Sequence, residues 1–141
     1  MGKKDWRQLG PGWYFLEQWE AGKIRWTSRS AEAYLAAGPG NKQIYLRLFS
    51  GDSFLGDRIT GSLKLAFSSD RFSFVPVGEA VFDLPAGIWT DVKAPIKEPL
   101  SGNGIILVQI LVDQNRIPAE LVPDSRDTRE LGLAVSGMAV R

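Results

Sequence analysis

Apolar and polar residues alternate with a period of two in several short segments, and this pattern constrains the fold of the chain more than any other feature. The alternation is present in residues 43–49, 62–68, 72–75 and 79–84. It is typical of β-strands that bury one face and expose the other to water. Glycine- and proline-containing turns separate the segments and exclude long helices. The sequence predicts an all-β fold of about eight to ten short strands, an antiparallel β-sandwich of the jelly-roll type.

Three further segments carry more specific predictions. Residues 104–112 are apolar on both faces, which predicts a central strand covered from both sides or a strand that crosses between environments. In residues 131–140 the alternation changes phase across Ser136-Gly137, which indicates a β-bulge. Residues 30–37 are the one helical candidate, but the run is short and Gly-Pro-Gly follows it, so we expect a strand or an irregular crossing.

The composition excludes several classes of function. The chain has 17 lysines and arginines and 16 aspartates and glutamates, a net charge of +1, whereas nucleic-acid binding requires a basic excess on one face. It has no cysteine and no histidine. This excludes disulfides, thiolate metal sites, histidine-dependent triads and most zinc sites. We therefore expect no cofactor, no metal and no nucleic-acid partner.

A chain of 141 residues is the size of one domain. We expect a tail over residues 1–10 and a single β-sandwich domain over residues 11–141. No apolar run is long enough to insert into a membrane, and the first ten residues lack the apolar segment of a signal peptide. These features predict a cytoplasmic protein, unless the chain was cut from a longer one.

Four of the five tryptophans lie within the first 26 residues: Trp6 in the expected tail, then Trp13, Trp19 and Trp26. Strand alternation would place Trp13, Glu17 and Trp19 on one face. Tryptophan rings offer a large apolar surface with one polar N–H, which suits the faces of sugar rings. Charged neighbours can hydrogen-bond to the sugar hydroxyls. The predicted sugar contacts here are Trp13, Tyr14, Glu17, Trp19 and Arg25.

A purely structural role is the alternative for these residues, because large aromatic side chains in small β-domains usually belong to the core. On that interpretation Trp26 faces the core and Glu17 forms an ion pair with Arg25. Trp89, which follows the turn at residues 85–87, is expected to pack on the core as a cap.

Charged residues are concentrated in residues 123–135, just before the last apolar segment. Asp127 and Arg129 are the further ligand candidates, as groups that could bind sugar hydroxyls. The alternative is a surface loop pinned by arginine–carboxylate pairs. Calcium is disfavoured because arginines interrupt the carboxylates and the spacing is not that of an EF-hand loop.

Catalysis is not expected. Glu17 and Glu20 could be imagined as a glycosidase pair, but Glu20 falls in an expected exposed turn. The chain contains none of the nucleophile, nucleotide-binding or zinc-protease motifs. We predict that the protein is not an enzyme.

Two motifs stand near the two ends of the chain. The first comprises Gly12-Trp13-Tyr14, Glu17 and Arg25-Trp26-Thr27, and the second comprises residues 118–121 and then 127–135. Both resemble motifs of small bacterial β-sandwich domains associated with polysaccharide biosynthesis, which have serine at the position of Thr128. Such domains occur alone or attached to glycosyltransferases and methyltransferases. The resemblance implies a non-catalytic, glycan-associated β-sandwich.

The leading hypothesis is therefore a non-catalytic carbohydrate-binding or accessory domain whose partner is an oligosaccharide or polysaccharide. The alternative is a protein–protein interaction or assembly module that binds a glycosyltransferase or a second copy of itself. A hydrolase ranks third, because it would need a second carboxylate across a cleft from Glu17.

Overall fold

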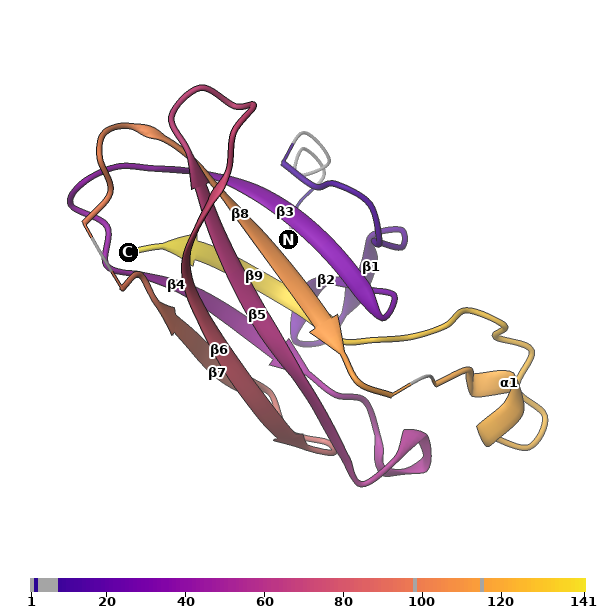
Figure 1. The fold of residues 1–141 in the computed structure, drawn as a ribbon. Coiled ribbons are helices and arrows are strands. Elements are labelled where there is room, and N and C mark those ends of the chain that lie inside the picture. The colour runs from indigo at the N-terminus through magenta and orange to yellow at the C-terminus, as the bar shows by residue number, and fades with distance from the viewer. Residues whose placement is uncertain (1, 3–7, 98, 115) are drawn as a thin grey trace.

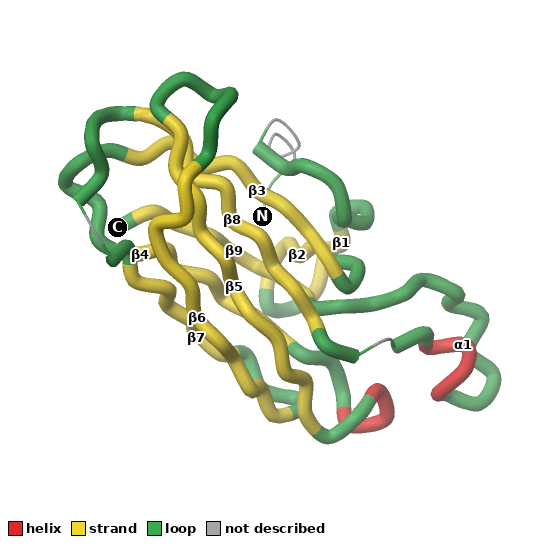
Figure 2. The backbone as a smooth tube through the Cα atoms, in the orientation of Figure 1, coloured by secondary structure: helices red, strands yellow, loops and turns green. Residues whose placement is uncertain are grey.

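The computed structural model describes residue 2 and residues 8–97, 99–114 and 116–141. Within this part of the chain, nine strands form two antiparallel sheets packed face to face (Figures 1 and 2). The five-stranded sheet has the order β1 (Glu17–Trp19), β2 (Gly22–Trp26), β9 (Ala134–Val140), β4 (Gln43–Phe49) and β7 (Thr90–Pro95). The four-stranded sheet has the order β3 (Ser30–Ala37), β8 (Gly104–Val112), β5 (Arg58–Ser68) and β6 (Val75–Pro85). The predicted all-β sandwich is confirmed.

Two short helical turns, η2 (Ser53–Leu55) and α1 (Pro118–Leu121), lie in loops at one end of the sandwich and contact each other. Figure 1 shows α1 projecting beyond the ends of the strands, at the end of the molecule where β2 ends and β9 begins. None of the helices formed by the described residues has both the length and the apolar character needed to cross a membrane.

The period-two pattern explains the core between the sheets. Ile44, Leu46 and Leu48 point inward from β4 and are fully buried, while Tyr45 and Arg47 point outward. The apolar strand β8 pairs on one side with β3 and on the other with β5, which confirms its predicted central position but not the predicted cover on both faces. Its inward side chains are buried and its outward ones are only half-buried. Its apolar outer face is therefore covered only in part.

Residues 30–37 and 131–140, for which the sequence made more specific predictions, also contain strands. β3 pairs with β8 over all of residues 30–37, and its inward residues Ala31 and Ala33 are fully buried. In β9, Gly137 stands opposite Arg47 and Val135 opposite Leu48, which leaves Ser136 as the extra residue of the predicted bulge. The extra residue allows Val135 and the later apolar residues of β9 to face the same core.

The N-terminal segment joins the fold earlier than the sequence predicted. Leu9 forms a bridge with Ala33, Tyr34 N donates to Gln8 O at 2.7 Å, and Gly10 N donates to Glu32 O at 2.8 Å. Residues 8–10 thus extend along β3 instead of belonging to a tail. Trp6 lies outside the described residues.

Thr27, just after β2, is hydrogen-bonded to residues 132 and 133, just before β9, so segments near the two ends of the chain are joined here. Thr27 N donates to Leu133 O at 2.8 Å, and Gly132 N donates to Thr27 O at 2.7 Å. Leu133 N donates to the hydroxyl of Thr27, a fully buried side chain, at 3.0 Å. This junction holds the charged loop of residues 123–131 against β1 and β2.

One arginine is enclosed beside this junction. Arg116 is 4% exposed, and its Nη2 donates to Gly132 O. Its Nε and Nη1 are buried without an acceptor among the described residues. Burial lowers the pKa of Arg116 to about 10, because a charge is disfavoured away from water.

We expect Arg116→Met to keep or raise the free energy of unfolding, by up to about 2 kcal/mol, because it replaces a poorly paired buried charge with an apolar side chain of similar length. Loss of the bond to Gly132 O offsets part of this gain. Urea and thermal unfolding would measure the change. Arg116→Ala is the comparison, since it also removes packing and should be about 2 kcal/mol less stable than the methionine variant. A methionine variant as unstable as the alanine variant would contradict this prediction.

Candidate functional site

Four aromatic residues from three strands and a loop pack together at the end of the sandwich near α1. Trp19 lies with its ring centroid 5.9 Å from those of Trp26 and Phe49 and 6.4 Å from that of Trp89, in edge-on geometries. Phe49 and Trp89 stack at 5.1 Å. We call these four residues the aromatic cluster. It belongs to a second, smaller core with Ile24, Leu55, Leu131 and Ala134.

A hollow of about 250 Å³, the end hollow, opens beside the aromatic cluster. Trp19, Trp26 and Phe49 form one wall, and apolar residues from the loops form the rest. Charged and polar side chains border it, from β1, from the loop before η2 and from the loop after α1. These polar residues are Glu17, Asp52, Ser125, Asp127 and Arg129.

Arg129 is the centre of an ion-pair network at this hollow. Its Nε and Nη2 donate to the carboxylate of Asp127 at 3.0 Å and 2.8 Å, and its Nη1 donates to Glu17 Oε2 at 3.2 Å. The hydrogen bonds from Arg129 hold the pKa of Asp127 below its usual value. The same network raises the pKa of Arg129, with the Asp127 bond as the largest cause. The three side chains are about one-third exposed, so a ligand can reach them.

The structure therefore brings together four of the seven predicted ligand residues: Glu17, Trp19, Asp127 and Arg129. Tyr14 contacts Arg129 but does not line the end hollow. Its ring is 5.4 Å from the guanidinium carbon of Arg129, and its hydroxyl donates to Glu130 O at 3.0 Å. The predicted Glu17–Arg25 pair is replaced by the Glu17–Arg129 pair. Arg25 Nη1 instead donates to Tyr14 O at 3.1 Å.

Trp13 does not share a face with Trp19, contrary to the prediction from alternation. Thr27 stands opposite Trp13, but Ile24 stands opposite Glu17. Residues 14–16 thus face only residues 25 and 26, so one extra residue interrupts the strand. An insertion of one residue moves every later side chain to the other face.

As a result, Trp13 lies in a separate hollow of about 280 Å³, which is also lined by Arg25 and by the 90% exposed Phe15. The indole N–H of Trp13 donates to Glu32 O at 2.8 Å. The polar atom of this tryptophan is therefore occupied within the fold. The structural interpretation of Trp26 as a core residue agrees with its exposure of 4%. Trp89, expected to pack on the core as a cap, is half-buried against the smaller core.

Several lining residues were not singled out in the sequence. Asp52 was recognisable only as part of a Gly-Asp turn, and Phe49 and Leu55 only as apolar residues. They reach the hollow because β4 runs directly into the loop that carries η2. No local signal marked them, since the rest of the lining, from β1, β2 and residues 118–131, is more than twenty residues away in the chain.

A second polar surface crosses the outer face of the four-stranded sheet. The register places Gln109 between Glu32 and Lys64, and Lys64 next to Glu79. Gln109 Nε2 donates to Glu32 Oε1 at 3.3 Å. This row joins four strands, so only the register could reveal it.

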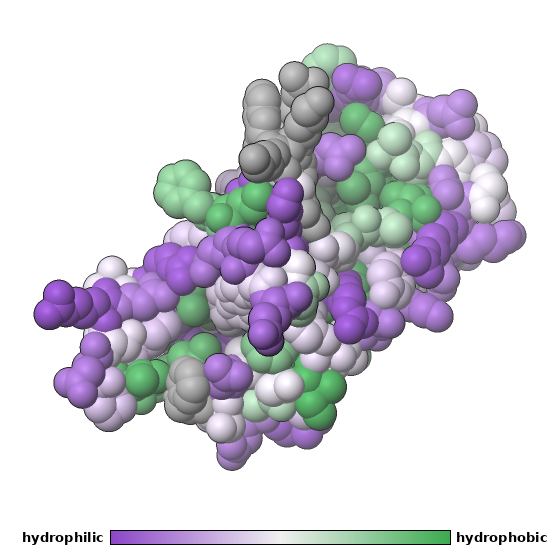
Figure 3. Space-filling view, turned by 180° about the vertical axis from the view of Figure 1, so that it is seen from behind, coloured by the Kyte–Doolittle hydropathy of each residue, from purple (hydrophilic) through white to green (hydrophobic). Residues whose placement is uncertain are grey.

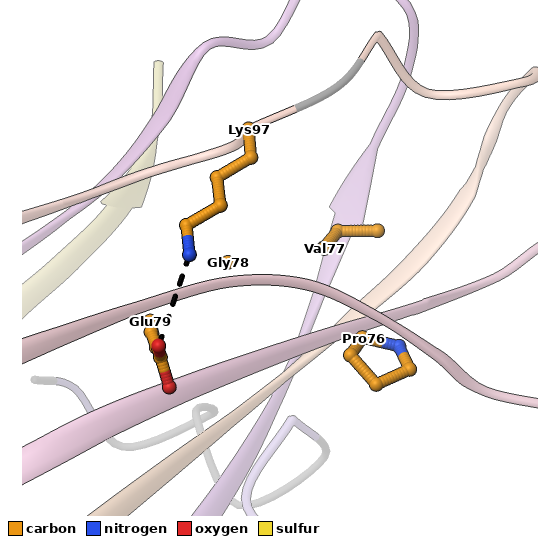
Figure 4. A pocket seen from close by; sticks show the side chains of 5 residues that line it. All are labelled: Pro76, Val77, Gly78, Glu79 and Lys97. Atoms are coloured by element: carbon orange, nitrogen blue, oxygen red, sulfur yellow. Dashed lines mark ion pairs between the residues drawn. The ribbon is translucent and has the colours of Figure 1, made fainter.

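A hollow of about 320 Å³ lies where the edges of the two sheets meet (Figure 4). Lys97 N donates to Val77 O at 2.8 Å, and Lys97 Nζ reaches across to Glu79 Oε1 at 3.7 Å. The residues that line it are Pro76, Val77, Gly78, Glu79 and Lys97, none of them aromatic. The ion pair is well exposed and contributes little stability. We regard this hollow as a structural junction between the sheets.

Seen from behind, the described residues carry apolar side chains in several groups with hydrophilic residues around them, and the broadest group lies at the upper right of the view (Figure 3). Among the described residues, no group of three or more histidine, cysteine, aspartate and glutamate side chains is arranged to hold a metal ion.

Comparison with known proteins identifies the fold but no family. No family model matches the sequence, and no curated protein matches it. A solved structure of CsCBM6-3 from Clostridium stercorarium in complex with cellobiose superposes with a TM-score of 0.54 at 11% identity, covering 93% of this chain and 82% of that one. The CBM22-2 xylan-binding domain of Paenibacillus barcinonensis Xyn10C gives a TM-score of 0.52 at 12% identity, with coverages of 95% and 91%.

A third structure contains the CBM22-1 and GH10 modules of the Clostridium thermocellum xylanase Xyn10B, complexed with xylohexaose. It gives a TM-score of 0.56 at 14% identity, and the match covers 95% of this chain but 25% of the xylanase chain. At these identities the likeness concerns the fold. The chain has the antiparallel β-sandwich fold found in carbohydrate-binding modules.

Proposed function

We propose that the protein is a non-catalytic carbohydrate-binding module and that its ligand binds in the end hollow. The observation that carries the proposal is the composition of this hollow: an aromatic wall that includes Trp19 lies next to the charged groups of Glu17, Asp127 and Arg129. Apolar ring faces complement the C–H faces of sugars. Ionised groups form strong hydrogen bonds, which here would be directed at sugar hydroxyls.

The fold supports the same function, because the structural neighbours are carbohydrate-binding modules, one bound to cellobiose and one described as xylan-binding. The end motifs extend the proposal to an accessory role in bacterial polysaccharide biosynthesis. They make bacterial exopolysaccharides the ligands to test beside cello- and xylo-oligosaccharides.

The hydrogen bonds that Asp127 and Glu17 accept from Arg129 support a binding role without catalysis. A glycosidase needs a carboxyl group that stays protonated near neutral pH as the general acid. The pKa of Asp127 is instead lowered by Arg129, and Glu17 is paired with the same guanidinium. Asp127 is thereby suited to accept hydrogen bonds rather than to donate a proton, and Glu17 already accepts one from Arg129.

Titration of tryptophan fluorescence with these glycans tests the proposal. We expect a saturable change for at least one glycan, and at least about tenfold weaker binding for Trp19→Ala and for Asp127→Asn, a loss of about 1.4 kcal/mol. Gln109→Ala, on the outer face of the other sheet, is the matched control and should bind as the wild type does. Circular dichroism would establish that each variant is folded.

Two results would overturn the proposal. One is a folded wild-type protein that binds none of the glycans. The other is loss of binding in Gln109→Ala with normal binding in Trp19→Ala and Asp127→Asn, which would place the ligand on the outer face of the four-stranded sheet. Light scattering on the same samples would detect self-association.

A further inference from the structure

The end hollow has a negative charge that the whole chain does not have. Three carboxylates, Glu17, Asp52 and Asp127, and one guanidinium, Arg129, line it, which gives a formal charge of −2. The net charge of the whole chain is +1. Arg47 lies over the ring of Trp89 in the aromatic cluster, but it does not line the hollow and is paired with Asp91 at 3.0 Å. The negative charge is therefore local to the hollow.

Arg129, the positively charged side chain in the lining of the hollow, already donates hydrogen bonds to the carboxylates beside it. Arg129 uses one side of its guanidinium for both oxygens of Asp127 and its remaining amino group for Glu17. An arginine binds an incoming carboxylate best through two parallel hydrogen bonds. Three of the five N–H groups of Arg129 donate to these two carboxylates. Arg129 therefore positions Asp127 and Glu17, and an acidic sugar that approaches it meets two carboxylates of like charge.

Asp52 adds a carboxylate outside this network. It precedes η2 at the N-cap position, yet its side chain forms no capping hydrogen bond. The side chain is exposed at the border of the hollow. A cationic group in the hollow would meet the carboxylates and also the aromatic faces, which attract cations as well.

We propose that the end hollow selects a sugar with a protonated amine, a hexosamine whose nitrogen is not acetylated, over neutral sugars, and that it disfavours uronic acids. This inference rests on the proposed function and specifies its ligand. Attraction between an ammonium group and nearby carboxylates strengthens binding, and repulsion weakens the binding of a sugar carboxylate. Both effects decrease as salt screens the charges.

Four tetrasaccharides test the inference by the same fluorescence titration: the β-1,4-linked tetramers of glucose, N-acetylglucosamine and glucosamine, and tetragalacturonate. The first three share one linkage and differ at carbon 2. At low salt and a pH at which the amine is protonated, we expect the glucosamine tetramer to bind at least about tenfold more tightly than cellotetraose. Tetragalacturonate should bind least, and the difference between the glucosamine and glucose tetramers should shrink in high salt.

Asp52→Asn should reduce the preference for the amine without abolishing binding of the neutral tetramer. Glu79→Gln is the matched control, because it removes a carboxylate from the other sheet, and it should keep the full preference. Equal affinity for the glucosamine and glucose tetramers, or tighter binding of tetragalacturonate, would overturn the inference and leave the proposed function intact. Failure of the protein to bind any glycan would overturn both.

Discussion

Trp26→Ala is expected to lower the free energy of unfolding by about 3–5 kcal/mol, the usual cost of truncating a large buried aromatic side chain. Trp26 is 4% exposed and lies 5.9 Å from Trp19, ring centroid to ring centroid. It packs in the smaller core with Ile24 and Leu131. The cavity would open at the point where β2 meets β9 and where the end hollow has its wall. Stability and ligand binding should therefore fall together.

Urea unfolding at 25 °C measures the loss, with Trp19→Ala as the comparison. Trp19 is only half-buried and borders the hollow, so its truncation should cost less than that of Trp26. The two variants then separate a packing tryptophan from a tryptophan that faces the ligand. A loss below about 1 kcal/mol for Trp26→Ala would mean that the aromatic cluster is not closely packed.

The sheets could be predicted because their signal is local. In residues 44–48 of β4 the polarity of each residue shows whether it faces the core, and the same holds for residues 62–65 of β5. The bulge in β9 was also predictable, because Ser136-Gly137 visibly changes the phase of the alternation. For these elements the physical cause, burial of one face, acts on neighbouring residues of the chain.

The candidate site was predictable only in part, because its geometry depends on register and on distant loops. The extra residue within 14–16 separates Trp13 from Trp19, and nothing in the polarity of Tyr14, Phe15 and Leu16 reveals it. The Glu17–Arg129 contact joins residues 112 positions apart. Asp127 and Arg129 were nevertheless recognisable, because their pairing is local.

Gly132→Ala is expected to lower the free energy of unfolding by about 3 kcal/mol, because a buried backbone contact leaves no room for a methyl group. A Cβ atom at Gly132 would lie 2.2 Å from Ser28 O and 2.4 Å from the hydroxyl oxygen of Thr27. The backbone acceptor cannot move without breaking the hydrogen bonds between Thr27 and residues 132–133. The strain would fall on the junction that joins the two ends of the chain.

Gly137→Ala is the matched control, since a Cβ atom there meets nothing within 4 Å and its φ angle is not in the left-handed region. Its stability should be unchanged or higher by about 0.4–1 kcal/mol, because alanine restricts the unfolded chain. Thermal unfolding of both variants measures the difference. A Gly132→Ala protein as stable as the control would show that the junction can relax.

The junction also gives a physical meaning to the two end motifs. Trp26 and Thr27 of the first motif contact Leu131, Gly132 and Leu133 of the second, through packing and hydrogen bonds. Buried motif residues of this kind maintain the fold, whereas Glu17, Asp127 and Arg129 are one-third exposed and remain available to a ligand. We therefore expect Gly132→Ala to weaken glycan binding only as far as it unfolds the protein. Asp127→Asn should weaken binding in a protein that stays folded.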